Sequence, residues 1–321
     1  MNNDLLKAKI CKLYYQNNLS KIDIGKKLRI SRFKVADLLA QALKEDIVEI
    51  TINEPSHTFL DLENSLEEKF KIYRAVVVKT SFNYEEIKKD IGRAAANCLL
   101  DMTYDGDVIG VAWGTTIYEM VNFLPLSIER DNISVVQVTG GLNQISMDFN
   151  AIELTRRVAK AFGAKSYQLY APAIVDSIDT KNVLMSESNI KKTIEMFSKI
   201  NIAIVGVGSV VPEPSTMLYR DGFIGKEDFE NISKCGAVGD INSYFYDKNG
   251  NRCKTELERR TIGIDLDSLR RVRYVMAICG GKFKADAIYG ALKGKIINII
   301  VTDEETAKEI LKKWRNKYFR C

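Results

Sequence analysis

Apolar runs rich in β-branched residues alternate with amphipathic segments over most of this 321-residue chain. Because strands that are buried on both faces read as continuous apolar runs, the alternation from Tyr73 onward predicts a largely parallel sheet with helices on both faces. The expected strands cover residues 75–78, 108–113, 133–138, 202–207, 274–278 and 296–301. The expected helices cover residues 85–102, a segment beginning near 115, and residues 151–162, 282–292 and 303–316.

The first 50 residues carry a different pattern, which is typical of a helix-turn-helix. A first helix is expected to bury Ile22, Ile24 and Leu28, and Arg29-Ile30 is expected to form a short turn. A second helix would begin after Ser31, a residue type that is favoured at helix N-caps. Its apolar residues recur at i, i+3, i+4 and i+7 and are predicted to point inward: Val35, Leu38, Leu39 and Ala42. The following segment, residues 46–52, alternates like a short strand and would be the wing of a winged helix.

The opposite face of this second helix keeps polar and aromatic residues in its first turns, where a recognition helix contacts bases and phosphates. Residues 1–50 carry ten Lys and Arg against six Asp and Glu, a surplus that is most of the net charge of +5. A basic head on a nearly neutral body is typical of binding to a phosphate backbone, although a small helical subdomain with solvated lysines is the alternative. The predicted DNA-binding residues are Ser20, Lys21, Ser31, Arg32, Phe33, Lys34 and Asp37.

The composition argues against several classes of enzyme, metal-binding protein and membrane protein. The single histidine, His57, falls in an expected linker, which argues against Ser-His or Cys-His catalysis and against histidine-rich metal sites. The six cysteines are scattered without a C-x-x-C pair, so most are expected to be buried core residues. No apolar run approaches the roughly 20 residues of a membrane span, and the N-terminus lacks the layout of a secretory signal. A cytoplasmic protein without metal, cofactor or catalytic residues is therefore expected.

Glycine and hydroxyl residues follow several of the predicted strands. These strand ends read Trp113-Gly114-Thr115-Thr116, Thr139-Gly140-Gly141, Gly206-Val207-Gly208-Ser209 and, with lysines, Gly280-Gly281-Lys282-Phe283-Lys284. Ligands bind at the carboxyl ends of strands in open parallel sheets, and free N–H groups at helix starts can hold an anion. Neither a G-x-G-x-x-G dinucleotide fingerprint nor a Walker A motif is present, which favours a sugar phosphate over a nucleotide. Asp240 could accept hydrogen bonds from sugar hydroxyls, and Asp247 to Gly250 is expected to form a turn.

These residues together resemble the SorC family of bacterial sugar-responsive transcriptional regulators, nearly from end to end. The matching segments are residues 24–39 with 47–48, 113–116, 136–141, 171–175, 206–209, 236–240, 280–288 and 301–304. The resemblance implies a winged helix-turn-helix head followed by a Rossmann-like α/β effector domain similar to sugar-phosphate isomerases. It also implies a phosphorylated sugar that changes operator affinity, and self-association to dimers or tetramers.

The resemblance also suggests roles for individual residues. Gly114, Thr115 and Thr116 look like phosphate ligands, and Lys284 looks like a further phosphate or hydroxyl contact. The residues implied to lie beside the sugar are Thr139, Gly140, Gly141 and Asp240. The corresponding domains would be residues 1–53 for DNA binding, 54–72 as a linker and connecting helix, and 73–321 for effector binding.

The sequence thus predicts a DNA-binding regulator of a carbohydrate-metabolism operon that is controlled by a phosphorylated sugar. The alternative is a sugar-phosphate isomerase or deaminase with an accessory DNA-binding head. Such chemistry needs a well-placed general base, and Asp240 is the best candidate. A scaffold that binds DNA but no ligand is a third possibility.

Overall fold

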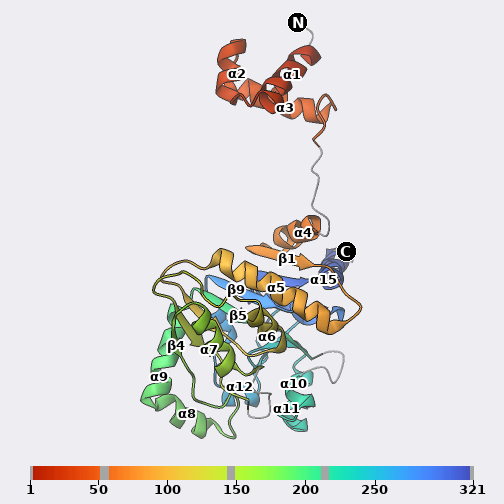
Figure 1. The fold of residues 1–321 in the computed structure, drawn as a ribbon. Coiled ribbons are helices and arrows are strands. Elements are labelled where there is room, and N and C mark those ends of the chain that lie inside the picture. The colour runs from red at the N-terminus through yellow and green to blue at the C-terminus, as the bar shows by residue number, and fades with distance from the viewer. Residues whose placement is uncertain (1–2, 51–57, 143–148, 211–216, 319–321) are drawn as a thin grey trace. The chain divides into compact units, whose positions relative to one another are not determined.

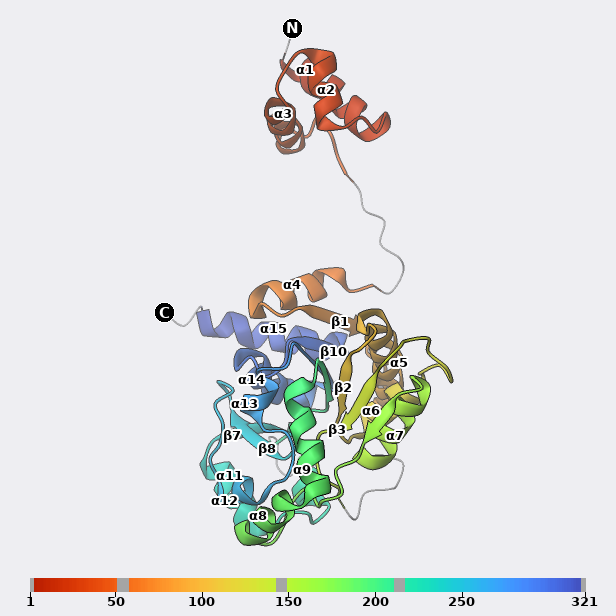
Figure 2. The same ribbon diagram turned by 90° about the vertical axis from the view of Figure 1, so that its left-hand side faces the viewer.

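The structure is a computed structural model that describes residues 3–50, 58–142, 149–210 and 217–318. The chain divides into two compact units, a smaller one, Met1–Ser56, and a larger one, His57–Cys321. Figures 1 and 2 show helices in the smaller unit and a helix-flanked sheet in the larger one. In the described part of the chain, no helix is long and apolar enough to cross a membrane.

Serine side chains cap the two helices of the predicted helix-turn-helix. The described residues of the smaller unit form α1 (Asn3–Cys11), a π-helical segment (Lys12–Gln16), α2 (Lys21–Leu28) and α3 (Arg32–Lys44). Ser20 Oγ accepts a hydrogen bond from the backbone N–H of Asp23 at 3.2 Å, and Ser31 Oγ accepts one from Lys34 at 3.1 Å. Helix α2 ends at Leu28, and its C-cap residue Arg29, with a left-handed φ of 55°, turns the chain toward α3. The predicted turn and N-cap are both found.

The core of the smaller unit confirms the inward face predicted for the second helix. The four inward residues of α3 are at most 5% exposed: Val35, Leu38, Leu39 and Ala42. The prediction for Ile22 is wrong, because its side chain is 50% exposed while Ile24 is fully buried. Residues two apart on a helix point about 200° apart, so both cannot face the core. Gly25 fills the inward position instead, where a Cβ atom would lie 2.8 Å from the carbonyl oxygen of Ile30.

The expected wing strand is not found in the part of it that the structure describes. Residues 46–50 form turns and coil, and residues 51 and 52 lie outside the described residues. Asp46 adopts a left-handed φ of 54°, which interrupts an extended conformation at the start of the segment. Ile47 and Val48 still pack against the core of the unit, so their apolar character serves packing rather than strand pairing.

The larger unit is built on a parallel sheet, as predicted, and this sheet has seven strands. The strands lie in the order β1-β10-β9-β5-β2-β3-β4, and every neighbouring pair is parallel. Their bounds are β1 Arg74–Val78, β2 Val108–Val111, β3 Ser134–Gln137, β4 Lys165–Tyr167, β5 Ile202–Val205, β9 Tyr274–Ile278 and β10 Ile299–Asp303. The short, mostly exposed β4 has no continuous apolar run and was not predicted.

Helices cover both faces of this sheet. The described helices of the larger unit are α4 Leu60–Phe70, α5 Tyr84–Met102, α6 Thr115–Asn122, α7 Ala151–Ala161, α8 Ile178–Ser186, α9 Ser188–Glu195, α10 Met217–Arg220, α11 Lys226–Lys234, α12 Glu256–Arg260, α13 Leu266–Leu269, α14 Ala285–Lys293 and α15 Glu304–Tyr318, with 3-10 turns at Met196–Lys199 and Lys282–Lys284. Helices α5, α6 and α7 lie on one face, and α14 and α15 lie on the other (Figure 2).

Helix α4 covers the edge strand β1. Glu67 Oε1 accepts a hydrogen bond from the backbone N–H of Ala75, and Glu63 Oε1 accepts one from Val77, both at 2.8 Å. These carboxylates satisfy the outward N–H groups of an edge that would otherwise be open to pairing with another strand. The connecting helix predicted within residues 54–72 is therefore joined to the larger unit.

A second, antiparallel sheet was not predicted. It consists of β6 (Gly208–Ser209), β7 (Ala237–Ile241) and β8 (Tyr244–Asp247). Asn242 and Ser243 join β7 to β8 with φ angles of 55° and 67°, the conformation of a two-residue hairpin turn. The turn predicted after Asp247 is present, since its Oδ1 accepts hydrogen bonds from the N–H groups of Asn249 and Asn251.

The cysteines largely follow the prediction. Cys11, Cys98, Cys253 and Cys279 are free and buried, whereas Cys235 is exposed. Cys321 and His57 lie outside the described residues.

Asp303, at the end of β10, holds together the loop that follows β9. Its Oδ1 accepts hydrogen bonds from Gly281 N at 2.8 Å and Thr306 Oγ1 at 2.6 Å. Its Oδ2 accepts hydrogen bonds from Thr80 Oγ1 at 2.9 Å and Thr306 N at 3.1 Å. The side chain is 1% exposed, so these four donors take the place of water around a buried carboxylate. Asp303 therefore fixes the backbone that leads into Lys284.

We expect Asp303→Asn to lower the free energy of unfolding of the larger unit by about 1–3 kcal/mol, because the amide nitrogen cannot accept from these donors. Urea denaturation followed by tryptophan fluorescence measures this, since the two tryptophans of the chain, Trp113 and Trp314, both belong to this unit. The matched control is Asp101→Asn, which removes an exposed ion pair with Arg74 and should cost less than about 1 kcal/mol. Equal losses in both variants would contradict the role given to Asp303.

Candidate functional site

A pocket opens at the carboxyl edge of the parallel sheet, between the ends of β2 and β5. The connection from β2 leads through α6 to β3, whereas the chain beyond β5 returns to β9 on the other side. Neighbouring strands whose connections leave in opposite directions create a crevice at their carboxyl ends, and ligands bind there in open α/β sheets. Residues from both strand ends line the pocket, Trp113 to Ile117 after β2 and Gly206 to Ser209 after β5.

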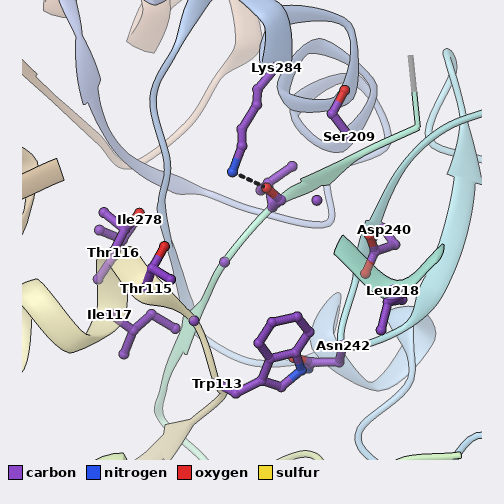
Figure 3. Close-up of a pocket in the computed structure, with 14 residues that line it drawn as sticks. Trp113, Thr115, Thr116, Ile117, Ser209, Leu218, Asp240, Asn242, Ile278 and Lys284 are labelled. Atoms are coloured by element: carbon purple, nitrogen blue, oxygen red, sulfur yellow. Dashed lines mark hydrogen bonds between the residues drawn. The ribbon is translucent and has the colours of Figure 1, made fainter. Parts of the chain in front are cut away.

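The first turn of α6 forms one side of this pocket (Figure 3). Gly114 is its N-cap residue, with a φ of 150° and no capping side chain. The first intrahelical hydrogen bond runs from Tyr118 N to Gly114 O at 2.9 Å. Helix geometry therefore leaves the N–H groups of Thr115 to Ile117 without partners inside the helix. Together with the hydroxyls of Thr115 and Thr116, they form a neutral but positively polarised end that favours an anion.

Lys284 extends into the pocket from the 3-10 turn before α14. Its Nζ donates a hydrogen bond to the carbonyl oxygen of Val207 at 3.0 Å, drawn as the dashed line in Figure 3. Since an ammonium group has three donors, two are left for a ligand. Burial lowers the pKa of Lys284, while the neighbouring Cys279 and Asp240 act to raise it. An anionic ligand would further favour the charged amine.

Asp240, on β7, supplies a buried carboxylate. Its side chain is 5% exposed, and its Oδ2 accepts a hydrogen bond from Ser243 N at 3.2 Å. A Cβ atom on Gly208 would lie 2.0 Å from Asp240 Oδ1, so only glycine at position 208 leaves room for this carboxylate. Burial raises the pKa of Asp240 to about 6, against the opposing effects of the Ser243 N–H and the Lys284 charge. The carboxyl can thus both accept and, when protonated, donate hydrogen bonds.

The structure brings together five of the eight effector-binding residues predicted from the sequence. These are Gly114, Thr115, Thr116, Asp240 and Lys284, which all line the pocket. Segments that are far apart in the chain supply them, from the end of β2, from β7 and from the turn before α14.

Thr139, Gly140 and Gly141 are not among the residues that line this pocket. Thr139 is fully buried and forms a bridge to Gly263, and Gly141 forms one to Pro172. A Cβ atom on Gly140 would lie 2.4 Å from the backbone of Pro172 and Ala173, so the glycine serves a close backbone approach. Residues 143–148, which follow, lie outside the described residues. A contact between this segment and a sugar stays a prediction.

Other lining residues were not predicted. Ser209 follows a strand whose glycine-rich end was visible in the sequence, but Trp113, Leu218, Asn242 and Ile278 were not assigned to the site. Leu218 and Asn242 come from elements that the periodicity of the sequence did not predict. No sequence signal would have placed them beside α6, because their position depends on the small antiparallel sheet.

The candidate DNA interface lies in the smaller unit, on the first turns of α3 and the start of α2. All seven predicted residues are exposed there: Ser20, Lys21, Ser31, Arg32, Phe33, Lys34 and Asp37. The guanidinium carbon of Arg32 lies 4.9 Å from the ring centroid of Phe33, which is 68% exposed. Such a pair keeps an apolar ring and a cation together on an exposed surface.

At the other end of α3, the buried Lys7 of α1 forms an ion pair with Glu45. This pair joins α1 to the end of α3.

Comparisons with known proteins place the larger unit in a family and match most of the chain to known regulators. The family model described as "Putative sugar-binding domain" matches residues 54–312. The chain is 34% identical over 308 residues to the deoxyribonucleoside regulator of Bacillus subtilis (strain 168), covering 95% of this chain and 97% of that protein. It is 31% identical over 312 residues to the sorbitol operon regulator of Klebsiella pneumoniae, covering 95% and 97% respectively.

Solved structures show the same likeness. The full-length sorbitol operon regulator SorC from Klebsiella pneumoniae superposes with a TM-score of 0.76 at 30% identity, covering 97% of this chain and 100% of that one. A DeoR family transcriptional regulator from Listeria monocytogenes gives a TM-score of 0.71 at 31% identity, covering 78% of this chain and 98% of that one.

The raised pKa of Asp240 predicts a pH-dependent stability of the larger unit. Between pH 4 and pH 6 the unfolded chain has lost this proton while the folded protein keeps it, so stability falls as the pH rises and levels off above pH 6. The shift from 3.8 to about 6 corresponds to about 3 kcal/mol. Asp240→Asn removes the titration while its amide oxygen still accepts from Ser243.

We therefore expect Asp240→Asn to be more stable than the wild type at pH 8 by up to about 3 kcal/mol, and by much less at pH 4.5. Urea denaturation followed by tryptophan fluorescence at the two pH values measures the difference. If the difference in free energy of unfolding between the two proteins did not change with pH, the pKa of the Asp240 carboxyl would be the same in the folded and unfolded protein.

Proposed function

This chain belongs to the family of transcriptional regulators with a sugar-binding domain that includes SorC, and we propose that a phosphorylated sugar in its larger unit controls its binding to DNA. DNA binding is assigned to residues 1–53, which contain the helix-turn-helix, and effector binding to residues 73–321. The regulated genes would form a carbohydrate-metabolism operon, and the protein would act in the cytoplasm, where its operator DNA lies.

The observation that carries this proposal is the pairing of an anion site and a hydroxyl site in one pocket. The first turn of α6 offers N–H groups and two threonine hydroxyls, and Lys284 adds a positive charge. Phosphate is the anion that such helix starts commonly bind. Asp240 offers a buried carboxylate in the same pocket, and carboxylate oxygens accept hydrogen bonds from sugar hydroxyls. A phosphorylated sugar satisfies both sets of groups with one molecule.

Several relatives fit this assignment by their names, among them regulators of deoxyribonucleosides, of the sorbitol operon and of erythritol catabolism. We propose that the effector changes operator affinity by binding differently to two arrangements of the protein, since only a difference in affinity can shift an equilibrium. We also propose that the chain self-associates as a dimer or tetramer, because paired helix-turn-helix units read two half-sites one helical turn apart.

The raised pKa of Asp240 is the one observation that favours an enzyme, since general acid–base groups are commonly tuned toward neutral pH. We nevertheless propose binding without turnover. Incubation of the full-length protein with pentose and hexose phosphates, followed by product analysis, separates the two functions. Isomerised or deaminated product would establish the enzyme.

Recognition of DNA should depend on the first turn of α3. We expect the double variant Arg32→Ala/Lys34→Ala to bind its promoter DNA about 10- to 100-fold more weakly in gel-shift titrations, because two cations near the phosphates are lost. The slope of log affinity against log salt should become shallower by about two. Lys44→Ala is the control, because it removes an exposed charge from the last turn of the same helix. Unchanged affinity in the double variant would show that another surface reads the DNA.

Effector binding should depend on Thr116. In a thermal-shift screen of sugar phosphates, we expect at least one compound to stabilise the wild type, and at 100 times its Kd the gain is about 2.7 kcal/mol. Thr116→Ala should weaken that binding about tenfold or more, because a hydroxyl at the helix start is lost. Thr155→Ala, a fully buried threonine on α7, is the control for the loss of a buried hydroxyl. A stabilising compound that binds Thr116→Ala and wild type equally would place the site elsewhere.

A further inference from the structure

Asn242 lies at the first position of the tight turn between β7 and β8. Its φ of 55° is a conformation that asparagine adopts more readily than most residues. The next residue, Ser243, donates its N–H to Asp240 Oδ2, which fixes the turn against the carboxylate. The turn explains why asparagine is suitable here. It does not explain the surroundings of the side chain, because residues at hairpin turns usually face water.

The side-chain amide of Asn242 is buried and incompletely satisfied. The residue is 5% exposed, and Nδ2 has no hydrogen-bond partner among the described residues. Buried polar groups nearly always have a partner, so each exception calls for an explanation. Asn242 lines the same pocket as Thr116 and Lys284, whereas Thr155 and Thr302, which also carry unpaired buried atoms, do not. A ligand oxygen in the pocket would supply the missing acceptor.

The neighbours of Asn242 indicate what kind of oxygen this is. Asp240 lies two residues away and lines the pocket with its carboxylate, and both come from the small sheet, opposite Thr115 and Thr116 of α6 (Figure 3). Trp113 lies between the two sides in this view. An amide N–H donates and a carboxylate accepts, so together they match a hydroxyl group, which does both. A phosphate at α6 would leave the far end of the ligand beside this pair.

We propose that Asn242 is a specificity-determining residue, whose amide donates a hydrogen bond to a hydroxyl oxygen of the effector at the end remote from its phosphate. This inference rests on the proposed function, because it takes the ligand to be a phosphorylated sugar or polyol. It adds that Asn242 distinguishes longer polyhydroxylated phosphates from shorter ones. A ligand without that hydroxyl would leave the amide buried and unpaired, and a site built to bond a hydroxyl rejects analogues that lack it.

Titration calorimetry of the full-length protein with glycerol 3-phosphate, ribose 5-phosphate and sorbitol 6-phosphate tests the proposal. Asn242→Gly removes the amide and keeps a residue that tolerates the turn conformation. We expect it to weaken binding of the longer probes that the wild type binds by about 5- to 20-fold, and of glycerol 3-phosphate by less than twofold. Asn132→Gly is the matched control, an exposed asparagine with a φ of 58° outside the pocket, and should change none of the affinities.

Asn242→Asp guards against a loosened turn, because aspartate also tolerates this backbone but replaces the donor with an acceptor. It should discriminate against the longer probes at least as strongly as Asn242→Gly, with a thermal unfolding transition that shows a folded protein. Equal losses of affinity for all three probes, or no loss of affinity for the longer ones, would overturn the role of Asn242 and leave the proposed function standing. If the wild type bound none of these probes, nor any other sugar phosphate, the proposed function would fail and this inference with it.

Discussion

The reversal of connection direction between β2 and β5 is the constraint on which the pocket depends. Chain leaving β2 passes over one face of the sheet toward β3, while chain leaving β5 passes toward β9. Neither connection can cover the carboxyl ends of both strands, so a crevice remains between them. The residues of α6, β7 and the turn before α14 that are proposed to bind the effector border that crevice. The start of α6 is on one side, and β6, with the sheet that it begins, follows β5 on the other.

Buried charges in and around the crevice are tolerated because specific groups hold them. The carboxylate of Asp303 accepts four hydrogen bonds, which replace its contacts with water. Asp303 therefore holds the loop before Lys284 in place. Asp240 and Lys284 are satisfied less completely. Burial raises the pKa of Asp240 and lowers the pKa of Lys284, because removing a charge from water favours the neutral form of each group. The proposed ligand, with a phosphate near Lys284 and hydroxyls near Asp240, would offset part of the cost of burying these charges.

Much of the fold could be predicted because the spacing of apolar residues along the chain reflects which residues are buried. The central strands of the parallel sheet are largely buried and therefore read as apolar runs. Helix α3 has one inward stripe, which the spacing of Val35, Leu38, Leu39 and Ala42 identified. The failures have the same origin. Strand β4 is mostly exposed, and β6 has two residues, so neither has a pattern that predicts a strand. Ile22 was assigned to the core by its residue type, although its angular position on α2 points it toward solvent.

The local chemistry of this protein follows from its amino acids alone: helix caps at Ser20 and Ser31, glycines where the chain turns into helices, and hydroxyl residues at strand ends. Each of these features depends only on residues a few positions away in the chain, so it can be predicted from the sequence. Which strand ends share a pocket, in contrast, depends on how the whole chain folds. The tertiary structure placed Asp240 and Asn242 opposite α6 and directed Thr139 and Gly140 into packing contacts instead. Those outcomes depend on strand order and on an unpredicted antiparallel sheet, which bring together residues more than a hundred positions apart.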